Sequence, residues 1–180
     1  MNGYVLIGPP GSGKTSVGQA LAEQLGLPFW DTDQLVSKTA GQSVADIFTH
    51  HGEAHFRMLE RQAVIDALEQ QASRGGVVAL GGGAPIDGDT GADLQTARRQ
   101  GLTVVFLDIS AAVAAKRVGL DASRPLLAGS PRRIWRELMD QRRPVYEGLA
   151  NLTVLVDGLE PQQIAAQIAT ATSPSKEMVK

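Results

Sequence analysis

Cysteine is absent from this 180-residue sequence, which excludes disulfide bonds, thiolate metal sites and thiol chemistry. Charge of one sign is also lacking: the formal net charge is −2, and no basic excess favours nucleic acid. Apolar runs stay well short of the roughly 20 residues that a membrane-spanning helix needs. We therefore expect a soluble protein of the cytoplasm that binds neither nucleic acid nor a membrane.

The chain length and the apolar content of 43% suit one domain with a full hydrophobic core. Met1 to Tyr4 show no charged region followed by a long apolar stretch, so we expect no signal peptide. A polar tail ends the sequence. We predict a single domain over residues 1–172 and a frayed tail over residues 173–180.

The most informative segment is Gly8–Thr15, which matches the P-loop pattern G-x-x-x-x-G-K-[ST] in full. An apolar strand pattern precedes it, and apolar residues at helical spacing follow it. Glycines let backbone N–H groups turn toward phosphate oxygens, and the helix N-terminus adds partial positive charge. Lys14 would reach the β- and γ-phosphates, and the Thr15 hydroxyl would bind Mg²⁺. The segment predicts a nucleoside triphosphate site.

Strand and helix patterns alternate along the chain, which implies an α/β fold with a parallel sheet covered on both faces. The Asp- and Gly-rich segment Ile86–Gly91 is interpreted as a loop. The predicted strands are Tyr4–Ile7, Phe29–Asp31, Val77–Leu80, Thr103–Asp108 and Leu152–Asp157. The predicted helices are Lys14–Leu25, Ser43–His51, Glu53–Gln71, Ala111–Val118, Pro131–Arg142 and Pro161–Thr170.

In open α/β sheets, ligands bind at the carboxyl ends of the strands. Asp31 and Asp33 follow the second strand, where one carboxylate could join a Mg²⁺ shell and the other accept a proton. Helix capping explains the pair equally well. Gly81–Gly83 follow the third strand and suggest backbone pressed against a ligand, with a flexible turn as the alternative. Asp108 ends the fourth strand and superficially resembles a Walker B carboxylate, but we expect it to cap a helix.

Three arginines are candidates for binding planar anions, because a guanidinium can donate two parallel hydrogen bonds. They are Arg57, Arg124 and Arg142, and each alone is more often a solvated surface charge. Arg124 lies in a short segment, about residues 119–131, that we interpret as a lid. His51 and His55 have metal-binding spacing, but no third ligand is evident, so a surface or packing role is expected.

The order of these motifs resembles shikimate kinase over about Tyr4 to Pro161. The resemblance implies transfer of the γ-phosphoryl group of ATP to the 3-hydroxyl of shikimate, in the route to aromatic amino acids. It also implies a monomer with a three-layer P-loop kinase fold, a sheet of order 2-3-1-4-5 and a short lid. It rests on Gly8–Thr15, Asp31-Thr32-Asp33, Gly52-Glu53, Phe56-Arg57, Glu60, Gly81-Gly82-Gly83-Ala84, Arg124-Pro125-Leu126-Leu127, Arg142, Pro144 and Tyr146.

Residue roles follow from the matching motifs. Lys14 and Arg124 would stabilise the transferring phosphoryl group, and Asp33 would bind shikimate hydroxyls and act as the base. The metal would be held by Thr15, with Asp31 in its water shell. The substrate-binding region would span about residues 32–61, and the substrate would contact Asp33, Arg57, Gly81, Gly82, Gly83 and Arg142. The nucleotide would contact Gly11, Ser12, Gly13, Lys14, Thr15, Ser16, Arg117, Arg124 and Pro161.

Two departures and several alternatives accompany this resemblance. The segment 84–102 is longer than the family usually has, and Pro85 stands where a β-branched residue is expected. A gluconate kinase shares the core but should lack the Phe-Arg and triple-glycine pairing, and a nucleoside monophosphate kinase should carry a longer lid. A guanine-nucleotide switch should show an Asn-Lys-x-Asp motif, which is absent. A non-catalytic nucleotide-binding homologue should have lost Lys14, Asp33 or Arg124.

Overall fold

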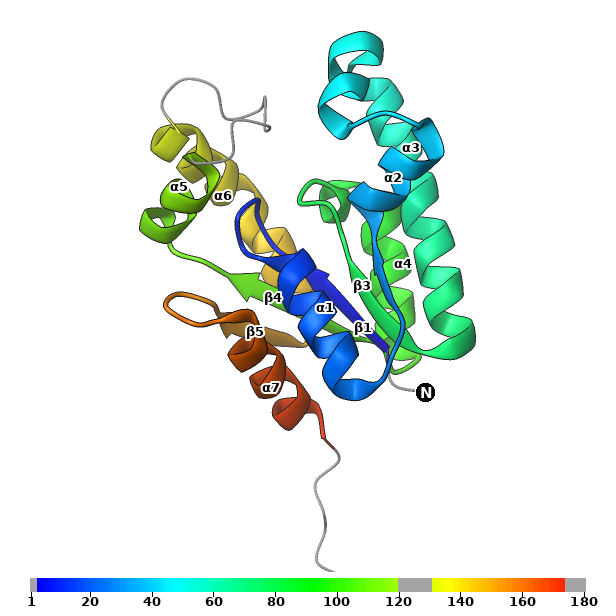
Figure 1. Cartoon of the computed structure of the whole chain (residues 1–180), viewed down its shortest axis with the longest axis vertical. Helices are drawn as coiled ribbons and strands as arrows, with labels where there is room; N and C mark the ends of the chain where they lie inside the picture. Colours follow the sequence, from blue (N-terminus) through cyan, green and yellow to red (C-terminus); the bar gives the residue numbers. More distant parts are fainter. Residues whose placement is uncertain (1–2, 120–130, 174–180) are drawn as a thin grey trace, which may run out of the picture.

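The computed structural model describes residues 3–119 and 131–173 (Figure 1). Its centre is a parallel sheet of five strands in the order β2-β3-β1-β4-β5, which confirms the predicted topology. The sheet order puts β1, which leads into the P-loop, at the centre of the sheet. The strands are β1 (Gly3–Ile7), β2 (Phe29–Asp31), β3 (Gly76–Ala79), β4 (Thr103–Asp108) and β5 (Leu152–Leu155).

Helices cover both faces of the sheet and complete the three predicted layers. Helices α1 and α7 pack side by side on one face, whereas α3, α4 and α6 contact the strands from the other (Figure 1). Their bounds are α1 (Lys14–Leu25), α2 (Thr32–Ala40), α3 (Val44–Arg74), α4 (Gly88–Arg99), α5 (Ala111–Gly119), α6 (Pro131–Leu149) and α7 (Pro161–Thr172), with a short 3-10 helix η1 (Ala84–Ile86).

The central strands are buried on both faces, as their unbroken apolar runs predict. Every residue of β1 and β3 is buried, and so are the four residues Val104 to Leu107 of β4. Burying one such side chain contributes about 1.5–3 kcal/mol, so these strands form a rigid base for the loops that leave them. At the end of β1 that lies away from the P-loop, the hydroxyls of Tyr4 and Thr172 lie 3.1 Å apart.

The interpretation of Ile86–Gly91 as a loop was wrong, because α4 begins inside it. Asp87 caps this helix by accepting a hydrogen bond from the N–H of Thr90 at 2.8 Å. Thr90 and Leu94 are then buried against the core, which offsets the low helix propensity of the Gly- and Asp-rich start. Helix α2 was also missed, and Asp31 caps it through the N–H groups of Asp33 and Gln34.

Two further boundaries are informative. The predicted break between two helices at Gly52 is confirmed as a kink within α3, with φ 80° and ψ 172° at that glycine. The prediction that the helix starting at Pro131 ends at Arg142 was wrong, because α6 continues through Pro144 to Leu149. Proline lacks the N–H for one helical bond, but Tyr146 and Leu149 are buried and hold the last turns to the core.

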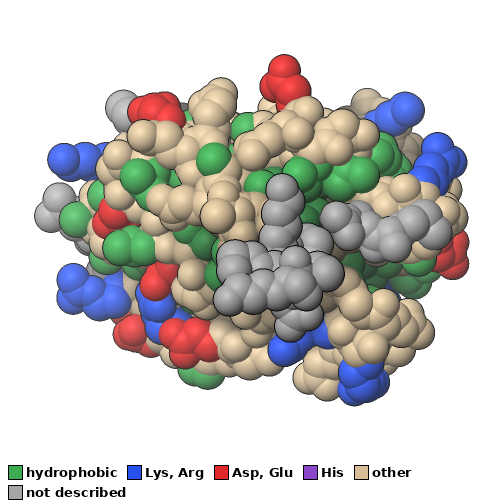
Figure 2. Space-filling view, turned by 90° about the horizontal axis from the view of Figure 1, so that it is seen from below, with side chains coloured by type: hydrophobic (Ala, Val, Ile, Leu, Met, Phe, Trp, Pro, Cys, Tyr) green, Lys and Arg blue, Asp and Glu red, His purple; other side chains and the backbone are tan. Residues whose placement is uncertain are grey.

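The surface seen from below in Figure 2 mixes basic, acidic and apolar side chains without a continuous basic area on that face. In the described part of the chain, none of the helices combines the length and the apolar character needed to cross a membrane.

Candidate active site

The P-loop connects β1 to α1 in a shape that glycine makes possible. Gly8, Gly11 and Gly13 have φ angles of 148°, 85° and 86°, which side chains rarely allow. A Cβ on Gly8 would lie 2.7 Å from the carbonyl oxygen of Leu107. Among the described residues, no side chain caps the N-terminus of α1. This helix end therefore offers its N–H groups and partial positive charge to an anion.

Polar groups of the same loop fit a phosphate. The ammonium of Lys14 donates to the carbonyl oxygens of Gly8, at 2.9 Å, and Pro9, at 3.0 Å, so it lies over the loop. The hydroxyl of Ser12 is buried and has no hydrogen-bond partner within the described ranges. An orphaned buried hydroxyl costs free energy, and a phosphate oxygen at this loop would supply an acceptor.

Thr15 and Asp31 form the group that fits a divalent metal. The Thr15 hydroxyl donates to Oδ2 of Asp31 at 2.6 Å, while Oδ1 caps α2 by accepting hydrogen bonds from the N–H groups of Asp33 and Gln34. Asp31 therefore caps α2 with one oxygen and contacts Thr15 at the phosphate loop with the other. A hydroxyl and a carboxylate beside a phosphate loop are oxygen ligands of the kind that Mg²⁺ prefers.

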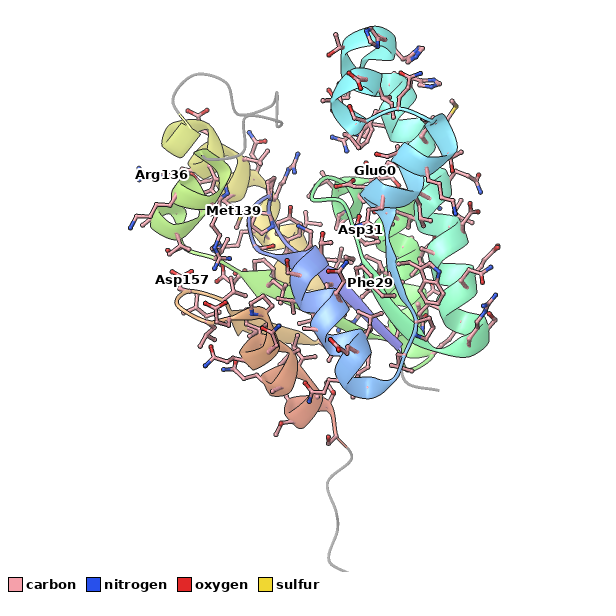
Figure 3. All side chains as sticks on the ribbon, in the orientation of Figure 1. Phe29, Asp31, Glu60, Arg136, Met139 and Asp157 are labelled. Carbon is pink, nitrogen blue, oxygen red and sulfur yellow. The ribbon has the colours of Figure 1, made fainter. Side chains whose placement is uncertain are left out.

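The first glycine after β3 lies against two carboxylates. A Cβ on Gly81 would lie 2.6 Å from Oε1 of Glu60 and 2.7 Å from Oδ1 of Asp33, so a side chain here would displace both. Asp31, at the start of α2, and Glu60, on α3, lie on the same side of the strand ends (Figure 3). Burial raises the pKa of Glu60 and the charge of Asp33 adds to the rise, whereas Arg57 and Arg142 oppose it.

Arg57 is held beside the third glycine by two glutamates. Its guanidinium donates to Glu60 at 2.5 Å and to Glu53 at 3.2 Å, and a Cβ on Gly83 would overlap it. Burial by itself would lower the pKa of Arg57, but the hydrogen bonds and charges of Glu60 and Glu53 raise it overall. Arg57 therefore presents a fixed positive charge to the loop.

The second glycine receives two donors from α6. The carbonyl oxygen of Gly82 accepts from Arg142 at 3.2 Å and from the phenol of Tyr146 at 2.6 Å. Arg142 and Arg57 then line a cavity of about 340 Å³ together with Glu60 and Gly83. The cavity is also lined by Arg61 and by the carboxylates of Glu53 and Asp87. Its guanidinium groups favour a ligand with a carboxylate.

A second cavity, of about 410 Å³, lies over the P-loop. Gly82 lines this cavity and Gly83 lines the other, so the glycine loop forms a boundary between them. Arg117 reaches the cavity from α5 and donates to the carbonyl oxygen of Gly11 at 3.3 Å. The predicted residues that line it are Gly11, Ser12, Gly13, Lys14, Thr15, Ser16, Asp31, Asp33, Gly82, Arg117 and Pro161.

The structure thus brings most of the predicted site residues to the carboxyl edge of the sheet. Arg124 and residues 120–130 of the predicted lid lie outside the described residues. His51 is exposed and His55 half-buried, and their rings are in contact with centroids 5.0 Å apart, which fits the surface or packing role expected for them.

The prediction that Asp108 caps a helix was wrong. Both of its oxygens accept hydrogen bonds from Arg143, at 2.7 and 2.9 Å, and this pair fastens α6 to the end of β4. The hydroxyl of Ser110 caps α5 instead, by accepting the N–H of Val113 at 3.4 Å, and Asp157 accepts the N–H of Ser110 at 3.0 Å. The adjacent arginines at 142 and 143 were the signal that one of them could pair with a strand-end carboxylate.

Sequence reasoning assigned no role to Trp135, Tyr146 or Glu60, although the last two belong to the quoted motifs. The indole N–H of Trp135 donates to the carbonyl oxygen of Pro10 at 3.3 Å. Trp135 and Tyr146 both donate to backbone carbonyl oxygens. Every residue has such an oxygen, so the sequence does not indicate which one is the partner. The signal available was the spacing of Arg142 and Tyr146, which places them on neighbouring turns of a helix.

The family model described as shikimate kinase matches residues 10–173 of this chain. The chain belongs to the shikimate kinase family. A shikimate kinase of Salinispora arenicola is 53% identical over 165 residues, which cover 92% of this chain and 94% of that protein. A shikimate kinase structure from Acinetobacter baumannii, in complex with shikimate, gives a TM-score of 0.86 at 31% identity and covers 95% of this chain and 92% of that one.

The gluconate kinase alternative is the more distant match. A gluconokinase structure from Sinorhizobium meliloti gives a TM-score of 0.58 at 23% identity, covering 94% of this chain and 94% of that one. A likeness at that identity concerns the fold. The Phe-Arg and triple-glycine pairing, which a gluconate kinase is expected to lack, is present at Phe56-Arg57 and Gly81–Gly83.

Proposed function

We propose that this site transfers the γ-phosphoryl group of ATP to the 3-hydroxyl of shikimate, a step of aromatic amino-acid biosynthesis. The observation that carries the proposal is the pair of cavities in a chain of this family. A phosphate loop with Lys14 lines one cavity, Arg57 and Arg142 are among the three arginines that line the other, and the loop after β3 lies between them. Phosphoryl transfer needs this arrangement, because positioning and charge neutralisation supply most of the catalysis.

ATP would occupy the cavity over the P-loop. The N-terminus of α1 and the loop N–H groups would bind its phosphates, and Arg117 and Pro161 would flank the adenine. Lys14 would exchange its contacts with the Gly8 and Pro9 carbonyls for the phosphate oxygens and neutralise charge that develops on the transferring group.

Thr15 and Asp31 would hold Mg²⁺, Thr15 directly and Asp31 through water. The ion would neutralise negative charge on the β- and γ-phosphates. The residues present fit the ion, since a hydroxyl and a carboxylate oxygen already lie 2.6 Å apart at the phosphate loop.

Shikimate would bind on the other side of the glycine loop. Arg57 and Arg142 would clamp its carboxylate, and Asp33, from the start of α2, would hold its hydroxyls. As the 3-hydroxyl oxygen attacks the γ-phosphorus, the Asp33 carboxylate would accept the hydroxyl proton while ADP departs. Arg124, from the lid over about residues 119–131, would stabilise the same phosphoryl group within one catalytic domain, residues 1–172.

The experiment is an ADP-release assay with Mg·ATP and four acceptors: shikimate, quinate, gluconate and AMP. Wild type should turn over shikimate strongly and the others weakly. Arg142→Ala should raise KM for shikimate roughly 10- to 100-fold, because a lost hydrogen bond between charged groups costs about 1.5–3 kcal/mol. Turnover of gluconate or AMP in place of shikimate would overturn the acceptor assignment, and no turnover with any acceptor would overturn the activity.

A further inference from the structure

Helix α6 contacts both loops of the site with donors from one of its faces. Near its start, Trp135 donates to the carbonyl oxygen of Pro10 in the P-loop at 3.3 Å. Near its end, Tyr146 donates to the carbonyl oxygen of Gly82 in the glycine loop at 2.6 Å. Positions 135 and 146 are about three helical turns apart and therefore share a face.

That face is the buried side of α6. Trp135, Met139 and Tyr146 are 3%, 4% and 0% exposed, and they follow one another at helical spacing. Figure 3 shows Met139 on the inner side of the helix, whereas the exposed Arg136 points outward. The bidentate pair between Arg143 and Asp108 fastens the same helix to β4. Packing on one side and this ion pair hold α6 as a fixed element beside the loops.

The two loops meet where α6 holds them. A Cβ on Gly82 would lie 3.2 Å from Cδ of Pro10 and 3.5 Å from the carbonyl oxygen of Gly8, so the loops are in contact. The residue that accepts from Trp135 is therefore the neighbour of the residue that accepts from Tyr146. One helix thus sets the relative position of the nucleotide loop and the acceptor loop.

The contact from Tyr146 gains importance once an anion binds. Gly82 accepts from Arg142 and Tyr146 together, and the proposed function turns Arg142 toward the substrate carboxylate. Tyr146 then keeps the Gly82 carbonyl directed at α6. In a trans peptide this places the N–H of Gly83 on the opposite side, away from α6. Burial raises the pKa of Tyr146, so the phenol keeps its proton and remains a donor.

We propose that Trp135 and Tyr146 are positioning residues through which α6 fixes the spacing between the nucleotide loop and the acceptor loop. Neither residue needs to touch a reacting atom. The identity of the ligands rests on the proposed function, whereas the two contacts belong to the fold. In-line transfer depends strongly on the separation and alignment of the reacting atoms, so loss of either contact should lower kcat.

The test uses Tyr146→Phe and Trp135→Phe, each of which removes one hydrogen-bond donor and keeps an aromatic ring. The chain holds two tyrosines and two tryptophans, which supply matched controls. Tyr4→Phe removes the hydroxyl that contacts Thr172 at the other end of β1. Trp30→Phe changes a ring that packs on Gly76, at the amino end of β3. Binding of ADP and of shikimate is measured by calorimetry, alongside KM, kcat and thermal unfolding.

Tyr146→Phe should weaken shikimate binding about five- to tenfold and leave ADP binding within about twofold, since one neutral hydrogen bond is lost. Trp135→Phe should show the opposite preference. If α6 fixes one spacing, the double variant should have a kcat close to that of the slower single variant, because either loss already releases the spacing. The controls should keep wild-type kinetics.

Equal weakening of both ligands by both variants, in step with their thermal destabilisation, would overturn the proposal and leave a packing role. Losses in kcat that multiply in the double variant would overturn the shared spacing. Wild type that binds ADP and fails to bind shikimate would overturn the acceptor assignment instead, and the effect of Trp135→Phe on ADP would still test the contact with the nucleotide loop.

Discussion

At the scale of single residues, the acceptor side of the site is defined by what glycine leaves out. Gly81 and Gly83 leave room for Asp33, Glu60 and Arg57, all of which a Cβ would displace. Arg57 donates a hydrogen bond directly to Glu60, so displacing either side chain from the loop would break this ion pair. Glycine at positions 81 and 83 therefore determines where these charged side chains lie.

Gly83→Ala should raise KM for shikimate at least about tenfold, because the new methyl group pushes away the Arg57 guanidinium and its charged contact. The end of a long side chain can move, so thermal stability should change little. Gly88→Ala is the matched control, since a Cβ there has open space. Steady-state kinetics of both variants decide the matter, and an unchanged KM in Gly83→Ala would contradict the role of Arg57.

Glu60 should make stability fall as pH rises. Its folded pKa lies above its ordinary value of 4.5, so between those two values the folded protein binds more protons than the unfolded chain. The free energy of unfolding therefore falls across that interval. Urea titrations from about pH 4.5 to 8 should show that Glu60→Gln lacks this part of the decline. Parallel pH curves for wild type and variant would exclude the raised pKa.

The sequence predicted the residues whose role is local. The P-loop and the carboxylates after β2 act through their own segment, so a motif identifies them. Glu60 pairs with Arg57, three residues earlier on the same helix. Trp135 and Tyr146 instead act through contacts made across the fold, with Pro10 and Gly82 respectively. These two contacts follow from the packing of α6 against the loops, which sequence spacing does not fix.

At the scale of elements, N-terminal helix caps explain why α2 and α4 form and why the sequence patterns did not predict them. The predicted loop became α4 because Asp87 satisfies an N–H at its start and two residues of its first turns are buried. The helix α2 was missed for the same reason, since Asp31 was weighed as a metal ligand or a cap and does cap this helix. Long, strongly apolar strands were predicted correctly because burial on both faces leaves one interpretation.

Asp87→Ala should lower the free energy of unfolding by about 1 kcal/mol at pH 7, the usual worth of an N-cap. The hydrogen bond to Thr90 is the largest reason that the pKa of Asp87 lies below its ordinary value of 3.8. The stabilisation is therefore present above that value and is lost as pH falls through the folded pKa. Chemical denaturation at pH 7 and about pH 3 measures the difference.

Asp89→Ala removes a nearby charge without removing the cap and serves as the control. A loss in Asp89→Ala as large as that in Asp87→Ala would point to the helix dipole in place of the cap.

At the scale of the whole molecule, ligands that bind the folded state should raise the unfolding temperature. At about 100 times its Kd, ADP with Mg²⁺ should add about 2.7 kcal/mol, or roughly 5–10 °C for a domain of this size. Scanning calorimetry with ADP, with and without a chelator, tests the metal as well. The same shift with the metal chelated would contradict the proposed role of Thr15 and Asp31, and Lys14→Met should show a smaller shift.

The contact between Tyr4 and Thr172 has a practical meaning for the layout of the chain. It brings the first described strand and the last described helix together at the end of the sheet opposite the P-loop (Figure 1). A short peptide linker could therefore join residues near 3 and 173, and new ends could be opened at an exposed turn elsewhere. Attaching the protein to a solid support through this end of the sheet would leave the candidate active site, at the other end, exposed to the solution.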